Sequence, residues 1–226
     1  METVIEIEKV TKKFGSQMVL DEVTLCCEQG KIYGIVGYNG CGKSVLFKCI
    51  CGLYHPDSGV IRVLGKTLFQ DIEIIPDMGA IIEEPAFINN YDALKNLNLL
   101  YMLNHKKDTE KMKRELQRVG LDPESKKKVR NYSLGMKQRL AIAQAIMEDA
   151  RILVLDEPMN GLDKEGAAEI RKLLLELRDE GKTILLASHN PMDIDVLCDE
   201  VYELEHGRLI GLAGERINFF QKGLDN

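Results

Sequence analysis

The segment Gly37-Tyr38-Asn39-Gly40-Cys41-Gly42-Lys43-Ser44 is the most informative part of this 226-residue chain for its fold class. It matches the pattern GxxxxGK[ST] in full. A short apolar run, Ile32 to Val36, precedes it and predicts a strand, and the apolar and small residues of Val45 to Cys51 predict a helix after it. In that context, glycines let the backbone wrap closely round phosphate groups, while N–H groups at the helix start point at anionic oxygens.

The end of this loop carries the chemistry that a nucleoside triphosphate needs. We expect Lys43 to reach the β- and γ-phosphates and the Ser44 hydroxyl to bind Mg²⁺. A chance glycine-rich turn would not need the lysine and the hydroxyl in these places. The predicted nucleotide-binding residues of this segment are Gly37, Tyr38, Asn39, Gly40, Cys41, Gly42, Lys43, Ser44 and Val45.

A second apolar strand, within Arg151-Ile-Leu-Val-Leu-Asp156-Glu157, ends in two acids. Parallel strands bring their carboxyl ends to one edge of a sheet, so these acids should meet the glycine-rich loop there. Asp156 can orient the water shell of a metal, and Glu157 can polarise a water for in-line attack on the γ-phosphate. Alone, two acids after a strand are also typical of a helix N-cap. Together the two motifs predict an enzyme that hydrolyses a nucleoside triphosphate.

Composition excludes several other classes of protein. With 45% hydrophobic and 29% charged residues the chain is too apolar to be disordered. Its net charge of −6 offers no general attraction to nucleic acid, so we expect no nucleic-acid partner. The longest apolar run, Leu99 to Leu103, is far too short to cross a bilayer. No secretory signal is visible at Met1 to Val10, and the six cysteines suit a reducing compartment, so we expect a cytosolic chain.

The order of predicted elements indicates an α/β fold in one domain, residues 1–226. The chain opens with period-two alternation typical of antiparallel strands, in Thr3 to Glu8 and Gln17 to Cys26, and a hairpin follows at Val60 to Val63 and Lys66 to Phe69. Helical spacing then dominates Asp92 to Leu103, Thr109 to Val119 and Met136 to Met147. A βαβ unit returns with Ile152 to Leu155, Lys164 to Arg178 and Thr183 to Ala187, and a last strand is expected at Arg208 to Ala213. We therefore expect a nucleotide-binding core with a helical subdomain, about residues 85–150, inserted in it.

Further segments narrow the kind of enzyme. Tyr132-Ser133-Leu134-Gly135-Met136-Lys137-Gln138-Arg139 precedes an Ala-rich helix and resembles the LSGGQ signature of ATP-binding cassette proteins. Asn160-Gly161-Leu162-Asp163 is similar to the D-loop of that family, and Ser188-His189 is similar to its switch histidine. Lys13-Phe14-Gly15 stands where the family has an adenine-stacking aromatic. The resemblance covers nearly the whole chain in order.

The resemblance implies a P-loop NTPase core of the RecA-like type with an antiparallel β subdomain, and ATP and Mg²⁺ as cofactors. Lys43, Glu157 and His189 would be catalytic, and Phe14 would stack on adenine. Two head-to-tail copies, or this chain and a near relative, would sandwich ATP. The residues that would then contact ATP in trans are Ser133, Leu134, Gly135, Met136 and Asp163. Without the surrounding motifs, His189 reads as a capping histidine and Phe14 as a core residue.

The family also implies separate transmembrane permease subunits, which this chain would power from the inner face of the cell membrane. Three residues depart from the usual family pattern: Glu83 stands where a metal-binding Gln is usual, and Leu134 and Met136 replace a Gly and a Gln of the signature. The implied metal ligands are thus Ser44, Glu83 and Asp156, and turnover could be slow. These departures resemble the ATPase subunits of bacitracin-type and lantibiotic-immunity exporters, so export of peptide antibiotics or amphiphilic compounds is expected.

Two other functions stay open at this point. One is a cassette ATPase not coupled to transport, although such proteins usually carry two cassettes in one chain. The other is a regulatory subunit that binds nucleotide and hydrolyses it weakly, which the three departures would suit. Cys41 raises a separate hypothesis, because a thiol at a helix N-terminus can have a lowered pKa and react readily. On that hypothesis ATP would protect Cys41 from alkylation; the alternative is a tolerated small residue.

Overall fold

The computed structural model describes residues 2–75, 77–83 and 86–212. Its N-terminal part forms a four-stranded antiparallel sheet in the order β2-β1-β4-β5. These strands are β1 (Thr3–Phe14), β2 (Gln17–Glu28), β4 (Ser58–Val63) and β5 (Lys66–Thr67). Ile5 of β1 lies opposite Cys27 of β2 and Val63 of β4, which fixes the register. The predicted hairpin is present, but its second strand is only two residues long.

A six-stranded sheet in the order β10-β9-β3-β8-β7-β6 forms the centre of the molecule. All its neighbouring pairs are parallel except β9 with β10. Its strands are β3 (Ile32–Val36), β6 (Met78–Ile81), β7 (Ile152–Asp156), β8 (Thr183–Ala187), β9 (Glu200–Glu205) and β10 (Arg208–Gly211). β3 and β8 are buried along their whole length, as parallel strands covered on both faces should be. Ala213, the predicted end of the last strand, lies outside the described residues.

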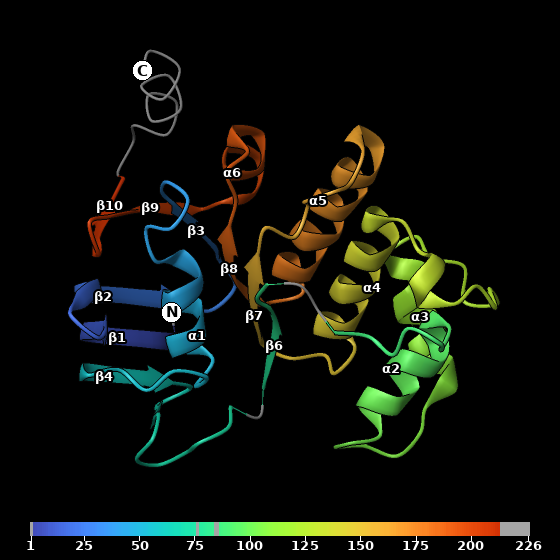
Figure 1. Ribbon diagram of the computed structural model, residues 1–226, viewed down its shortest axis with the longest axis horizontal. Helices are drawn as coiled ribbons and strands as arrows, with labels where there is room; N and C mark the ends of the chain where they lie inside the picture. Colours follow the sequence, from blue (N-terminus) through green and yellow to red (C-terminus); the bar gives the residue numbers. More distant parts are fainter. Residues whose placement is uncertain (1, 76, 84–85, 213–226) are drawn as a thin grey trace.

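Side chains of the central sheet alternate between two hydrophobic clusters. Tyr33 and Ile35 of β3 pack with α1 (Lys43–Ile50) and the antiparallel sheet, so α1 lies between the two sheets (Figure 1). Ile32 and Val36 face the opposite way, toward the helical side of the molecule. There α5 (Lys164–Asp179) and α6 (Pro191–Leu197) contact each other beside the sheet. This alternation is what a period of two demands of a strand with both faces covered.

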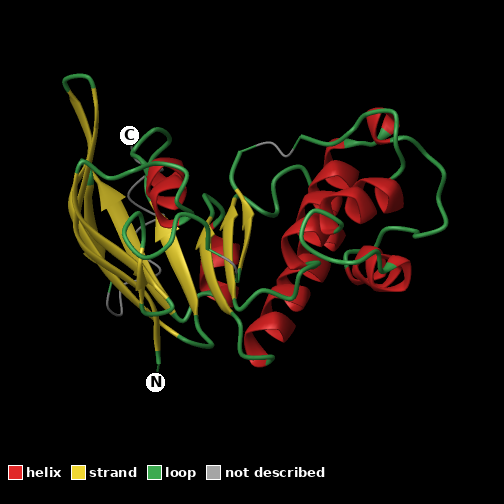
Figure 2. Cartoon of the chain, turned by 90° about the horizontal axis from the view of Figure 1, so that it is seen from below, coloured by secondary structure: helices red, strands yellow, loops and turns green. Residues whose placement is uncertain are grey.

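The described helices between β6 and β7 lie away from the antiparallel sheet (Figure 2). They are α2 (Ala93–Tyr101), α3 (Thr109–Arg118), a 3₁₀ turn (Val129–Asn131) and α4 (Leu134–Ile146). Each α-helix begins at a side chain that accepts a hydrogen bond from a first-turn N–H: Asp92, Asp108 and Ser133. α4 begins two residues earlier than helical spacing predicts, because Ser133 caps it. Within the described residues, no helix has the length and apolar character that crossing a bilayer requires.

The α/β fold and the P-loop architecture predicted from the sequence are confirmed. The topology explains how the site forms: β3 and β7 run parallel, separated by β8, so their carboxyl ends share one edge. The glycine-rich loop follows β3, and Asp156 and Glu157 end β7. Residues more than a hundred positions apart are thereby brought together.

Candidate active site

The glycine-rich loop contains glycines at positions where a side chain would be strained or would clash. Gly37 has φ 150°, and a Cβ there would lie 2.5 Å from the carbonyl oxygen of Leu204. Gly42 has φ 115° and is the N-cap of α1. Because glycine has no side chain to cap the helix, the first-turn N–H groups of α1 are left for an anionic ligand.

Lys43 lies across the mouth of this loop. Its Nζ donates hydrogen bonds to the carbonyl oxygens of Gly37 at 2.8 Å and Tyr38 at 3.2 Å, and the residue is buried. Carbonyl dipoles are weaker partners for an ammonium group than phosphate oxygens are. The side chain is therefore placed to exchange the loop carbonyls for the phosphates of a bound nucleotide.

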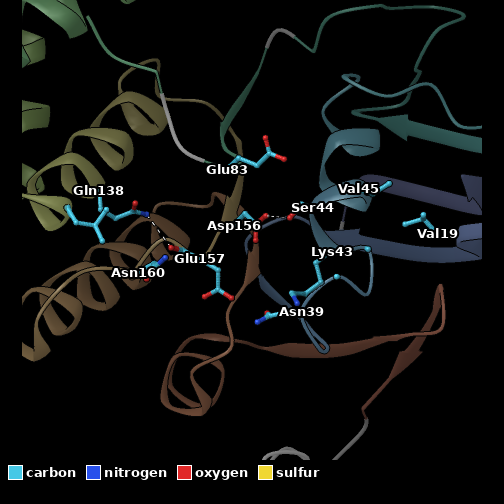
Figure 3. Close-up of a pocket in the computed structure, with 13 residues that line it drawn as sticks. Val19, Asn39, Lys43, Ser44, Val45, Glu83, Gln138, Asp156, Glu157 and Asn160 are labelled. Atoms are coloured by element: carbon cyan, nitrogen blue, oxygen red, sulfur yellow. Dashed lines mark hydrogen bonds between the residues drawn. The ribbon is translucent and has the colours of Figure 1, made fainter. Parts of the chain in front are cut away.

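Ser44 and Asp156 meet where α1 and β7 approach each other. The Ser44 hydroxyl donates to Asp156 Oδ2 at 2.5 Å (Figure 3). Next along the chain, Glu157 Oε2 is 2.8 Å from Nδ1 of His189, which follows β8. The structure thus brings together four residues predicted from three separate motifs.

Lys43, Ser44, Asp156 and Glu157 line one cavity of about 570 Å³ between the loop, the end of β7 and the start of α4 (Figure 3). His189 lines a second cavity, which shares Glu157 and Asn160 with the first. Of the predicted residues, ten line the first cavity: Asn39, Gly40, Gly42, Lys43, Ser44, Val45, Glu83, Leu134, Asp156 and Glu157. Three lining residues received no predicted role: Val19, Gln138 and Asn160. Gln138 and Asn160 stand inside the quoted motifs, so their position was a usable signal; Val19 gave none. A cavity of this size fits a nucleotide.

The loop that carries His189 is held by a buried ionic network. Asp193 is 1% exposed, accepts a hydrogen bond from the Ser188 hydroxyl at 2.7 Å and pairs with Arg171 at 2.6 Å. Ser188 in turn accepts from the N–H of Asn190 at 3.1 Å. Buried charges persist when paired and hydrogen-bonded, and such a network fixes the loop from which His189 reaches Glu157.

Glu83 lies on the loop after β6 and has a positive φ of 63°. It lines the cavity, but its carboxylate pairs with Lys48 of α1 at 2.5 Å rather than with Ser44 or Asp156. Lys48 also lies 5.2 Å from the centre of the Tyr54 ring. The predicted metal ligand is thus near the site and engaged with another partner.

Several predicted residues lie outside the 570 Å³ cavity. The Phe14 ring is 45% exposed and makes an edge contact with Tyr54 at 5.5 Å, and Tyr38 is 55% exposed. Ser133 caps α4, and the Asp163 carboxylate caps α5 through Gly166 N–H. Gly135 and Ser133 stand in the first turn at the exposed end of α4, while the Met136 side chain packs against the core.

Cys41 is buried, with its Sγ directed at Gly37. Burial raises the pKa of the Cys41 thiol and outweighs the nearby Lys43 charge, which lowers it. The hypothesis of a lowered pKa is therefore wrong, because less thiolate is present near neutral pH. We expect iodoacetamide to label Cys41 more slowly than exposed Cys26 at pH 7.5, with or without Mg-ATP, as measured by mass spectrometry of tryptic peptides. Faster labelling of Cys41 would contradict this placement.

Comparison with known proteins places this site in one family. The family model described as ABC transporter matches residues 20–160. YybJ of Bacillus subtilis (strain 168), an uncharacterized ABC transporter ATP-binding protein, is 42% identical over 91% of this chain and 94% of its own length. The bacitracin transport ATP-binding protein BcrA of Enterococcus faecalis is 40% identical over 93% of this chain and 69% of its own length. The lantibiotic transport ATP-binding protein SrtF of Streptococcus pyogenes is 34% identical over 91% of this chain and 89% of its own length.

Solved structures agree on the fold. An ATP-binding subunit of an ABC transporter matches with a TM-score of 0.84 at 27% identity, over 99% of this chain and 97% of that one. A bacterial ABC transporter cassette solved as a dimer matches with a TM-score of 0.82 at 24% identity, over 93% and 99%. The matches support the transport subunit and not the other functions left open by the sequence. This chain belongs to the ABC transporter family, as an ATP-binding, ATP-hydrolysing subunit.

Proposed function

We propose that the chain hydrolyses Mg-ATP at the cavity formed by the glycine-rich loop, Asp156 and Glu157. The observation that carries this proposal is the pairing of Ser44 with Asp156 and of Glu157 with His189 at one end of the loop. Lys43 and the N–H groups of α1 would bind the phosphates. Glu157 would act as the base that orients the attacking water, and His189 would steady Glu157 and the γ-phosphate.

The residues at this end of the loop fit Mg²⁺. Ser44 supplies a hydroxyl oxygen and Asp156 a carboxylate oxygen, and Mg²⁺ in nucleotide sites is usually held by one or two such groups together with substrate phosphates. Bound there, the ion would neutralise charge that develops on the phosphates. Glu83 could join these ligands after leaving Lys48.

We infer that the working unit contains two such chains, or this chain and a near relative. Residues of the second chain would complete each ATP-binding site. Support comes from Ser133 and Leu134, which are exposed at the N-terminus of α4, where backbone N–H groups favour an anion. Gly135, Met136 and Asp163 would complete that surface. The dimeric assembly of the matched cassette structure is consistent with this arrangement.

We propose further that residues 1–226 act as one ATP-binding domain, peripheral on the inner face of the membrane, that powers separate permease subunits. Identity to BcrA and SrtF favours export of peptide antibiotics or other amphiphilic compounds. Coupling to the permease would involve α2 and the segment from Glu83 to Phe87, of which residues 84 and 85 lie outside the described residues. Exposed apolar side chains on and after α2 support that contact: Leu99, Met102 and Leu103.

This function is tested by reconstituting the chain in proteoliposomes with candidate multi-span permease subunits. We expect ATPase activity that requires Mg²⁺ and rises when bacitracin or a lantibiotic is added. EDTA should abolish it, and the membrane protein alone is the control. ATPase activity that no added peptide changes would contradict the proposal that such peptides are exported. ATPase activity that is the same with and without the membrane protein would contradict coupling to a permease.

A further inference from the structure

Gln138 bonds the backbone at the catalytic end of β7. It is the fifth residue of α4 and half-buried, and its amide Nε2 donates to the carbonyl oxygens of Glu157 at 3.2 Å and Pro158 at 3.0 Å. Figure 3 shows the Gln138 side chain directed from α4 toward this segment. One side chain therefore holds two successive carbonyl groups next to the proposed base.

The backbone at Glu157 needs such support. Its φ is +50°, in the left-handed region that costs free energy for any residue with a Cβ. The Glu157 N–H donates to the Ala187 carbonyl at 2.9 Å, and the Glu157 carbonyl also accepts from Asn160 N–H at 3.0 Å. Gln138 is the one member of this set that comes from α4. The orientation of α4 is thus tied to the backbone from which the Glu157 carboxylate projects.

The first turn of α4 packs on the same segment of chain. A Cβ added at Gly135 would lie 3.0 Å from the Gly161 carbonyl oxygen. A Cβ at Gly161 would lie 2.5 Å from the Leu134 side chain, so these residues are in close contact. Together with the Gln138 bonds, these contacts join the start of α4 to residues 157–161 as one packed unit.

We propose that Gln138 is a positioning residue for Glu157. Its two hydrogen bonds hold the successive carbonyl groups of Glu157 and Pro158, and so fix the direction of the Glu157 carboxylate toward the attacking water. Because α4 also carries Ser133, Gln138 links the position of the surface that meets the partner's ATP to the base of the chain's own site. This inference rests on the proposed roles of Glu157 and of the start of α4.

The test is Gln138→Leu, which keeps side-chain size and removes the donor. We expect kcat for ATP hydrolysis to fall by about tenfold to a hundredfold, because small misplacements of a reacting group cost rates of this order. KM and the dissociation constant for a fluorescent ATP analogue should stay within about twofold, since Gln138 acts on the base and not on nucleotide binding. Gln144→Leu, the same change on the same helix, is the matched control and should leave kcat within about twofold.

A second variant guards against simple misfolding. Gln138→Glu keeps the size and polarity but cannot donate when ionised, so it should lose kcat to a similar extent, while a wild-type circular dichroism spectrum and a cooperative unfolding transition show that the chain is folded. The proposal is overturned if Gln138→Leu and Gln138→Glu keep wild-type kcat, if KM rises in step with the loss of kcat, or if Gln144→Leu loses as much. A wild-type protein without Mg-ATPase activity would instead refute the proposed function, and this inference with it.

Discussion

Replacing Glu157 with glutamine is expected to lower kcat for ATP hydrolysis by about a thousandfold and to leave ATP affinity within about threefold. Glutamine keeps the size of the side chain and can still contact His189, but it cannot accept the proton of the attacking water. Lys43 and the backbone groups that we propose to bind the phosphates are untouched. A phosphate-release assay on the purified chain, with equilibrium binding of a fluorescent ATP analogue, separates the two quantities.

Glu165→Gln is the matched control, because Glu165 is exposed in the first turn of α5 and lies away from the cavity. Its kcat should equal that of wild type. The Glu157→Gln protein should also accumulate as an ATP-bound dimer on size-exclusion chromatography, since hydrolysis no longer reopens it. Residual activity above about a tenth of wild type would be too high for loss of a general base.

Replacing Gly79 with alanine is expected to destabilise the fold by about 3 kcal/mol, at the upper end of the usual cost of overpacking. β6 runs so close to α4 that a Cβ at Gly79 would overlap the carbonyl oxygen of Ala145 and lie 2.9 Å from its carbonyl carbon. Both atoms belong to helix backbone, so no side chain can turn aside. In a chain of this length the thermal midpoint should fall by about 6 to 12 °C, measured by circular dichroism.

Gly211→Ala provides the opposite control within the same sheet. A Cβ there would lie 3.5 Å from a ring carbon of Tyr202, an ordinary contact. Alanine restricts the unfolded chain more than glycine does, so the change should be neutral or stabilising by up to about 1 kcal/mol. Equal midpoints for Gly79→Ala and wild type would show that β6 and α4 can separate without cost, contrary to the packing described here.

The elements that could be predicted from the sequence are those with a strongly periodic or chemically distinctive pattern. β3, β7 and β8 were predicted because buried parallel strands are continuous apolar runs. β6 was missed because Met78-Gly79-Ala80-Ile81 is short, contains a glycine and shows no alternation. β9 was missed because Glu200, Glu203 and Glu205 make it look like a surface segment. Both strands are fixed by neighbours distant in sequence.

The residues of the site also divide into those that could be predicted from the sequence and those that could not. Lys43, Ser44, Asp156 and Glu157 were predicted because their chemistry requires those residue types in that order. The ion pair of Glu83 with Lys48 could not be predicted, because it joins a helix to a loop 35 positions away in the sequence. Gln138 was visible within the signature, but its contacts with the end of β7 depend on how α4 packs. For Cys41, burial decides the pKa, and burial follows from the whole fold.

The central claim, that each ATP site is completed by a second chain, is tested most directly by mixing two inactive variants. Glu157→Gln lacks the base but keeps the start of α4. Ser133→Asp keeps the helix cap, since aspartate also caps, but sets a negative charge against the partner's phosphates. In a mixed dimer, the site with Glu157 from one chain and Ser133 from the other is intact.

Random pairing would make half of the dimers mixed, each with one intact site, which corresponds to about a quarter of wild-type ATPase activity. Because Glu157→Gln homodimers stay closed once they have bound ATP, we predict recovery of up to about this quarter. Each variant alone should be nearly inactive while still binding ATP. Activity of the mixture no higher than the sum of the separate variants, at concentrations where wild type is active, would contradict the composite site.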